Sequence, residues 1–153
     1  MPAIRTAGEL CTREVVTATR SMALNEAARL LRERHVGCLV VVDETREGRI
    51  VVGLLTDRDI VTAAIARDAS LLTLRVGDVM SDDVSMVHED SSVHDAIALM
   101  RHRRVRRVPV TSTRGFLTGV LTTDDIVKLL AGELQALAET VTEQRQLEQM
   151  LRP

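Results

Sequence analysis

The chain repeats itself, and this repetition constrains its fold more than any other feature. GLLTDRDI at residues 53–60 returns as GVLTTDDI at 119–126, an offset of 66 residues. LNEAARLLRERHV at 24–36 matches VHDAIALMRHRRV at 93–105, at an offset of 69. The change of offset places a three-residue deletion in the second copy, in a predicted turn, where folds tolerate deletions. We therefore expect two structural units of the same kind.

Each copy predicts the same series of elements. Short apolar segments at 15–18 and 85–87 predict strands, and the apolar residues that follow them have the spacing of a buried helix face. Those residues are Leu24, Ala27, Ala28 and Leu31 in the first copy, and Val93, Ile97 and Met100 in the second. A strand pair and a second helix follow, the helix beginning after Thr56 and after Thr122. Each copy thus reads β-α-β-β-α, and the fold class is α+β.

A unit of about 60 residues with one small sheet can hardly bury its apolar face alone, so the two units are expected to pack on each other. The first repeat is predicted at residues 4–67 and the second at 76–130, with a linker at 68–75. A C-terminal amphipathic helix is predicted at 131–153.

The repeated segment admits two interpretations. Thr56 and Thr122 are good helix N-cap residues, and Asp59 and Asp125 follow at the spacing of a capping box, so capping alone could explain both pairs. The same geometry suits a nucleotide. A helix N-terminus offers free N–H groups to a phosphate, and a carboxylate one turn along can accept both hydroxyls of a ribose. The residues leave both interpretations open.

The whole pattern resembles a tandem cystathionine-β-synthase (CBS) domain pair, or Bateman module, over about residues 4–130. The matching segments are GELCTREVVTA and GDVMSDDVSMV, NEAARLL and HDAIALM, and GLLTDRDIV and GVLTTDDIV. The resemblance implies two β-α-β-β-α repeats related by a pseudo-twofold axis, with two clefts between them. Such clefts typically bind AMP, ADP, ATP or S-adenosylmethionine. The resemblance also implies a homodimer shaped as a flat disc of four repeats.

Carried over by position, the resemblance predicts one cleft with every role filled, the Asp125 cleft. Its residues are Thr17, Arg106, Arg107, Val108, Thr122 and Asp125. Asp125 would hold the ribose, while Thr122 and the two arginines would bind the phosphates. Thr17 and the backbone near Val108 would meet the edge of the adenine. Arginine suits phosphate because its planar fork makes two parallel charge-assisted hydrogen bonds.

The other cleft, the Asp59 cleft, is predicted to be weaker for phosphorylated ligands. Its residues are Thr56, Arg58, Asp59, Gly37, Cys38 and Met86. Met86 stands where the Asp125 cleft has Thr17, and Gly37 and Cys38 stand where it has two arginines. Arg58 could replace one lost cation. In the Asp125 cleft the matching residue is Asp124, which would repel a phosphate somewhat.

Other functions find less support in the sequence. RHRRVRR at 101–107 could contact nucleic acid, but no aromatic residues are interleaved and the formal net charge is −2, which disfavours that interpretation. HEDSSVHD at 88–95 gathers histidines and carboxylates, yet its spacing fits no zinc pattern, so no metal site is predicted. No triad-like set of residues indicates catalysis. We expect neither enzymatic activity nor a required cofactor.

The C-terminal segment carries an apolar stripe near heptad spacing. Its residues are Val127, Leu130, Leu134, Leu137 and Val141, then Met150 and Leu151, with Gln144 interrupting. The apolar stripe is too short to span a membrane. The expected location of the protein is cytoplasmic. The stripe could dock on its own domain, on a second subunit or on a client protein. Gly132 is predicted to mark a bend in this helix.

The resulting hypothesis is a regulatory adenine-nucleotide sensor without catalysis, which signals by conformational change. A dimeric adaptor whose clefts bind nothing is the alternative, and binding of RNA or DNA through 101–107 is a third.

Overall fold

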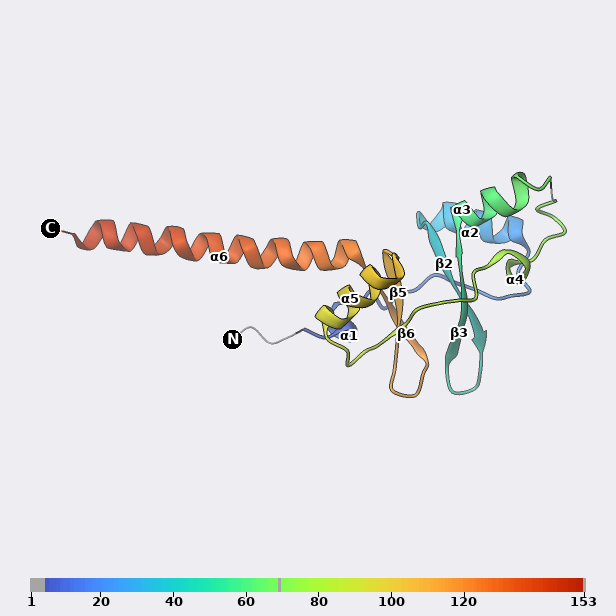
Figure 1. The fold of residues 1–153 in the computed structure, drawn as a ribbon, viewed down its shortest axis with the longest axis horizontal. Helices are drawn as coiled ribbons and strands as arrows, with labels where there is room; N and C mark the ends of the chain where they lie inside the picture. Colours follow the sequence, from blue (N-terminus) through green and yellow to red (C-terminus); the bar gives the residue numbers. More distant parts are fainter. Residues whose placement is uncertain (1–4, 69, 153) are drawn as a thin grey trace.

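The chain forms two lobes and a long projecting helix, as shown by a computed structural model that describes residues 5–68 and 70–152 (Figure 1). Each lobe contains one three-stranded sheet, with strand order β1-β2-β3 in the first and β4-β5-β6 in the second. The α+β fold with two copies of one unit is thereby confirmed. Residues 4, 69 and 153, which the predicted domain ranges include, lie outside the described part of the chain.

The two lobes have matching elements. The first contains β1 (Thr17–Ala18), α2 (Leu24–Arg34), β2 (Cys38–Glu44), β3 (Arg49–Thr56), α3 (Asp57–Ile60) and the π-helix η1 (Val61–Ile65). The second contains β4 (Val87–His88), α5 (Val93–Arg103), β5 (Arg107–Thr111), β6 (Leu117–Thr122) and α6 (Thr123–Leu151). In each sheet the short first strand pairs parallel to the second, and the second pairs antiparallel to the third.

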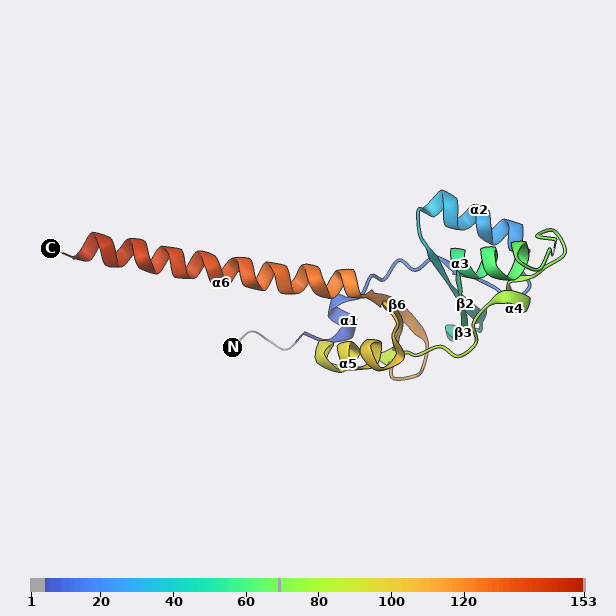
Figure 2. The same ribbon diagram turned by 45° about the horizontal axis from the view of Figure 1, so that its top comes forward.

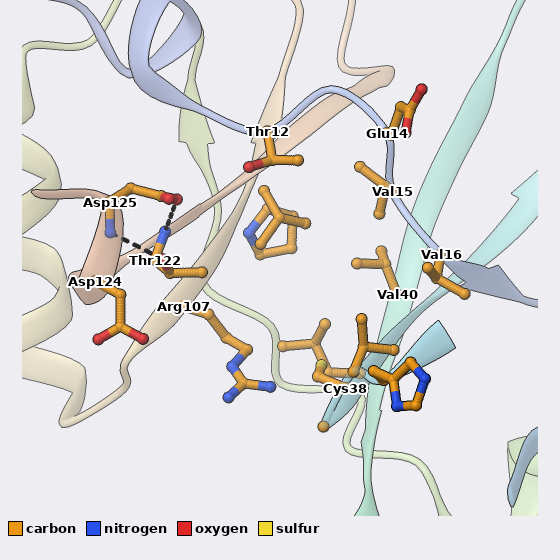
Figure 3. Close-up of a pocket in the computed structure, with 16 residues that line it drawn as sticks. Thr12, Glu14, Val15, Val16, Cys38, Val40, Arg107, Thr122, Asp124 and Asp125 are labelled. Atoms are coloured by element: carbon orange, nitrogen blue, oxygen red, sulfur yellow. Dashed lines mark hydrogen bonds between the residues drawn. The ribbon is translucent and has the colours of Figure 1, made fainter. Parts of the chain in front are cut away.

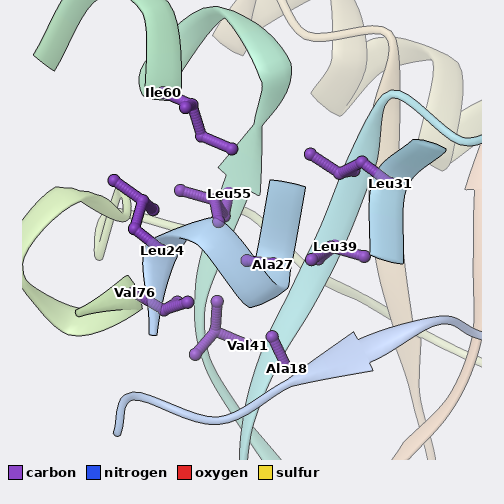
Figure 4. Close-up of a cluster of buried hydrophobic side chains, with 9 residues drawn as sticks. All are labelled: Ala18, Leu24, Ala27, Leu31, Leu39, Val41, Leu55, Ile60 and Val76. Atoms are coloured by element: carbon purple, nitrogen blue, oxygen red, sulfur yellow. The ribbon is translucent and has the colours of Figure 1, made fainter. Parts of the chain in front are cut away.

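Three apolar clusters hold the chain together. One lies between α2 and the sheet of the first lobe (Figure 4), and its buried residues are Ala18, Leu24, Ala27, Leu31, Leu39, Val41, Leu55, Ile60 and Val76. The equivalent cluster of the second lobe contains Ala7, Val87, Ala96, Met100, Val108, Val110, Leu121 and Ile126. A third, made of Val40, Val42, Val51 and Leu117, joins the facing sides of the two sheets. The two units therefore pack on each other, as their size requires.

The helix face predicted for α5 is partly wrong. Ile97 is 38% exposed, and the residue that faces the core in that turn is Ala96, which is fully buried and matches Ala27 of the first copy. Adjacent residues on a helix point about 100° apart, so only one of the two can face the sheet. The exposed Ile97 belongs instead to an outer surface of the second lobe.

The leading segment of each copy crosses to the other lobe, which the strand and helix pattern did not predict. Helix α1 (Ala7–Leu10) places Ala7 in the core of the second lobe, and α4 (Val76–Val79) places Val76 in the core of the first. Backbone hydrogen bonds secure both crossings. The N–H of Ala7 donates to the carbonyl of Ser91 at 2.8 Å, and the N–H of Val76 donates to that of Met22 at 2.9 Å. The two lobes are thus intertwined.

The glycine of the repeated segment is explained by the same crossing. Gly119 on β6 lies against the leading segment of the first copy, where Thr12 and Val120 exchange backbone hydrogen bonds of 3.0 Å. A Cβ atom at Gly119 would lie 2.8 Å from the carbonyl oxygen of Thr12 and still closer to Sγ of Cys11. Gly53 has the same role toward Met80 and Ser81. A side chain at either position would push the crossing strand away.

We expect Gly119→Ala to lower the free energy of unfolding by about 1–3 kcal/mol, the usual cost of overpacking a filled site. Gly132→Ala is the matched control, because nothing lies within 4 Å of a Cβ at Gly132 in the middle of α6. Alanine there should leave stability equal or raise it by up to about 1 kcal/mol, from helix propensity. Urea denaturation measures both. An unchanged midpoint for Gly119→Ala would contradict this account of the repeated glycine.

Helix α6 is continuous over 29 residues and runs straight in both views, so the bend predicted at Gly132 is wrong (Figures 1 and 2). Its only buried residue is Ile126, and the helix leaves the second lobe and projects away from both lobes (Figures 1 and 2). Across the described residues, no helix combines the length and apolarity needed to cross a membrane.

Candidate functional site

The two Thr-Asp pairs form the capping boxes that their spacing predicts. The Thr122 N–H donates to Oδ2 of Asp125 at 3.0 Å, and the Asp125 N–H donates to Oγ1 of Thr122 at 3.2 Å. Thr56 and Asp59 make the same pair of hydrogen bonds, at 2.9 and 3.1 Å. The capping interpretation is confirmed for both. It leaves Oδ1 of each carboxylate outside the box, so capping and ligand binding do not compete for that atom.

A pocket of about 400 Å³ lies between the lobes and opens at the N-terminus of α6 (Figure 3). This volume is in the range of small-molecule sites. Its lining residues are Thr12, Glu14, Val15, Val16, His35, Val36, Gly37, Cys38, Val40, Leu54, Arg107, Pro109, Val120, Thr122, Asp124 and Asp125. One side is polar and belongs to the second lobe, and the valines on the other side belong to the first.

Three of the six residues predicted for the Asp125 cleft line this pocket, namely Arg107, Thr122 and Asp125. The other three do not. Val108 is fully buried in the core of the second lobe, Arg106 is exposed outside the pocket, and Thr17 lies further along the leading segment. That segment meets the pocket instead through four residues ahead of Thr17, which are Thr12, Glu14, Val15 and Val16.

Gly37 and Cys38, predicted for the Asp59 cleft, also line the Asp125 pocket. In the repeat alignment they are equivalent to Arg106 and Arg107. Strands β2 and β5 begin next to these residues, where the two lobes meet. A Cβ at Gly37 would lie 3.7 Å from Nη1 of Arg107. Gly37 of the first copy thus lies beside the guanidinium of Arg107, which extends across the boundary between the lobes (Figure 3).

The remaining residues predicted for the Asp59 cleft are Thr56, Arg58, Asp59 and Met86, and none of them lines the Asp125 pocket. Arg58 and Met86 are exposed, and Asp59 is half-buried in its capping box. The weaker cleft at Asp59 stays a prediction.

The charge of the pocket differs from the one that the sequence suggested. The described residues that line the pocket include three carboxylates, those of Glu14, Asp124 and Asp125, and one guanidinium, that of Arg107, because Arg106 is exposed outside the pocket. Glu14 and His35 were missed by the sequence analysis. Both lie in irregular segments, where periodicity carries no information about orientation. His35 ends α2 with a left-handed backbone, φ 54°, and this turn brings it to the rim.

Both thiols near the site are held in the protonated form. Burial raises the pKa of Cys38, although the hydrogen bond and the positive charge of Arg107 oppose that shift. Burial likewise raises the pKa of Cys11, with Arg13 opposing it. A thiol with a raised pKa is a poor nucleophile at neutral pH, so neither cysteine suits nucleophilic catalysis.

The residues first considered for other chemistry are mostly exposed. Arg101, Arg103, Arg104 and Arg106 are exposed, and Arg103 pairs with Asp83 at 3.4 Å. Within residues 5–68 and 70–152, no three or more histidines, cysteines or carboxylates are grouped so that they could hold a metal ion.

Comparison with known proteins agrees with the fold and the repeats. The family model for the CBS domain matches twice, over residues 7–66 and 76–132. An uncharacterized protein of Methanopyrus kandleri is 32% identical over 122 residues, which are 80% of this chain and 61% of that protein. The chain thus spans less than two thirds of that relative.

Two solved structures are similar to this chain and contain ligands. A CBS domain pair in complex with 5′-methylthioadenosine and S-adenosyl-L-methionine is 26% identical, with a TM-score of 0.72, over 85% of this chain and 98% of that one. The cytosolic domain of the Mg²⁺ channel MgtE in complex with ATP is 28% identical, with a TM-score of 0.69, over 82% of this chain and 48% of that one.

Proposed function

Because the chain belongs to the CBS-domain family, we propose that it is a non-catalytic regulatory protein that binds an adenosine-containing ligand in the pocket between its repeats. The observation that carries the proposal is the pocket itself. It places the carboxylate of Asp125, the N-terminus of α6 and the guanidinium of Arg107 around one space of about 400 Å³. Similar solved structures hold S-adenosylmethionine, methylthioadenosine or ATP.

Each part of such a ligand has a partner in the pocket. Oδ1 of Asp125 is free of the capping box and accepts from the ribose hydroxyls. The N-terminus of α6 and Arg107 attract a phosphate. The valine side chains of the first lobe offer apolar contacts to the adenine ring, chiefly Val15, Val16 and Val40. Thr17, Arg106 and Val108 have no place in this arrangement.

The charges favour a ligand with a short or neutral tail. Three carboxylates against one guanidinium leave the pocket net negative, so each added phosphate meets more repulsion. We therefore propose AMP as the phosphorylated ligand, with S-adenosylmethionine, whose sulfonium is positive, as its competitor for the site. ATP would bind more weakly unless a divalent cation offsets its charge.

Binding is proposed to act through α6. Thr122 and Asp125 cap this helix at the pocket, so a ligand that contacts Asp125 contacts the first turn of the element that projects from the molecule. A ligand that binds the closed arrangement of the two lobes more tightly shifts the population toward it. We further propose that the protein acts as a homodimer.

Saturating AMP is expected to raise the thermal midpoint, because a ligand at a hundredfold excess over its dissociation constant stabilises the folded state by about 2.7 kcal/mol. It should also slow amide exchange in the first turn of α6. Thermal shift with AMP, ATP, S-adenosylmethionine and NADH, together with hydrogen-exchange mass spectrometry, tests both expectations. Native mass spectrometry of the purified protein identifies a copurified ligand. If none of the four compounds raises the midpoint, the protein is a dimeric adaptor and the sensor proposal is wrong.

A further inference from the structure

A second hollow lies on the opposite side of the α6 N-terminus, between α5 and α6. This α5–α6 groove encloses about 350 Å³ and is lined by Ile97, Met100, Arg101, Arg104, Val105, Thr123, Ile126, Val127 and Leu130. Its floor is apolar, and the exposed Arg101 and Arg104 form one rim. Ile97, Val127 and Leu130 are 38, 62 and 50% exposed. An exposed apolar surface of this kind marks a site where another molecule binds.

The groove continues into an apolar stripe along the projecting helix. This α6 stripe consists of Val127, Leu130, Leu134, Leu137 and Val141, all exposed. The steps between them are three, four, three and four residues, the a and d positions of a coiled coil. A helix of 29 residues is about 44 Å long, and its stability comes mainly from packing of its apolar face. Apart from the first turns, this face has no cover within the described part of the chain.

We propose that α6 of a second copy covers both surfaces, lying antiparallel with the twofold axis between Leu134 and Leu137. In this register Leu130 packs against Val141 of the second copy, and Leu134 packs against its Leu137. Twofold symmetry repeats each contact, so four successive layers are apolar on both sides. The stripe is therefore complementary to itself, which an interface between two copies of one chain requires.

The charges beside the stripe select this register. Antiparallel helices bring their e positions together and their g positions together. In the proposed register Glu133 faces Thr140 of the second copy, twice by symmetry, so no two like charges face each other. Shifting the helices by one heptad toward their N-termini would place Glu133 of one copy against Glu133 of the other. Two like charges facing each other weaken an interface.

The groove accounts for the residues where the heptad pattern ends. Glu148 occupies an a position, which a coiled-coil core disfavours. In the antiparallel register Glu148 of the second copy reaches the level of Thr123, at the groove whose rim carries Arg101 and Arg104. Leu147 of the second copy reaches the level of Ile126 on the groove floor. A parallel pair would instead place Glu148 of one copy against Glu148 of the other, inside the apolar interface.

Cross-linking of exposed cysteines tests the geometry. In a Cys11→Ser, Cys38→Ser background, we expect Ala131→Cys chains mixed with Ala138→Cys chains to be joined by a short bismaleimide. Ala131→Cys alone should not be joined, because residue 131 faces residue 138 of the second copy and lies about 13 Å along the axis from its own counterpart. Cross-linking of Ala131→Cys alone, or no cross-linking in the mixture, would overturn the proposed register.

Sedimentation of the full chain tests whether the stripe holds the copies together. Leu137→Lys should raise the dimer dissociation constant by about 100-fold or more, because symmetry places the charge in two apolar layers. Gln135→Lys adds the same charge on the outer face and should change it less than about threefold. Equal dimerisation of the two variants would refute the pairing, as would a monomeric unsubstituted chain. AMP binding by both variants is measured separately, so a failed sensor proposal is distinguished from a failed α6 pairing.

Discussion

Replacing Asp125 with alanine is expected to weaken AMP binding by about 100-fold. The carboxylate would lose two charge-assisted hydrogen bonds from the ribose, each worth about 1.5 kcal/mol or more, and 1.4 kcal/mol corresponds to a factor of ten. Titration calorimetry measures the change directly. The substitution also removes a capping box, so part of the loss could come from a frayed first turn of α6.

Asp59→Ala separates the two causes, because Asp59 caps α3 through the same pair of hydrogen bonds. Both substitutions should cost about 1 kcal/mol of the free energy of unfolding, the usual value for a lost cap. Only Asp125→Ala should weaken AMP binding strongly, since Asp59 lies outside the pocket. Equal losses of affinity would show that the two aspartates act alike and would end the proposed asymmetry between the clefts.

The features that the sequence predicted are those set by short-range contacts. Thr122 and Asp125 are three residues apart, and their capping box needs no information about the rest of the fold. The repeats could be predicted for a similar reason, because duplication copies every local pattern together. Helix spacing was less informative at Ile97. An apolar residue satisfies the pattern equally well whether it faces the lobe's core or the α5–α6 groove, and Ile97 lines the groove.

The crossing of the leading segments was not predicted from the strand and helix pattern, and it explains the error at Thr17. The sequence of α1 shows that Ala7 is small and apolar, but it does not show which of the two sheets Ala7 packs against. Because the two lobes exchange these segments, the leading segment of the first copy lines the Asp125 pocket with Thr12 and Glu14. Thr17, which was predicted to line it, does not. Gly37 was assigned by strict equivalence to the Asp59 cleft. Only the three-dimensional structure shows that the residues at the beginning of β2 and of β5 line the same pocket.

The second large effect is expected at Arg107, the one arginine among the described residues that line the pocket. Arg107→Met keeps the length of the side chain and its contact with Cys38 but removes the guanidinium. AMP affinity should fall by about 10- to 100-fold, because a hydrogen bond to a charged group is worth about 1.5–3 kcal/mol. Adenosine has no phosphate, so its affinity should change less than about threefold. The difference between the two ligands isolates the contribution of the phosphate.

Arg106→Met is the control, since Arg106 precedes β5 directly but is exposed and does not line the pocket. It should leave the affinity for both ligands within about threefold, the size of effect expected from a solvent-screened charge. A larger loss of AMP affinity for Arg106→Met than for Arg107→Met would restore the assignment made from sequence position alone. Equal losses of AMP and adenosine in Arg107→Met would mean that the guanidinium supports the walls of the pocket. Selective loss of AMP would instead make Arg107, reaching past Gly37 into the first lobe, the residue by which the two repeats together recognise a phosphate.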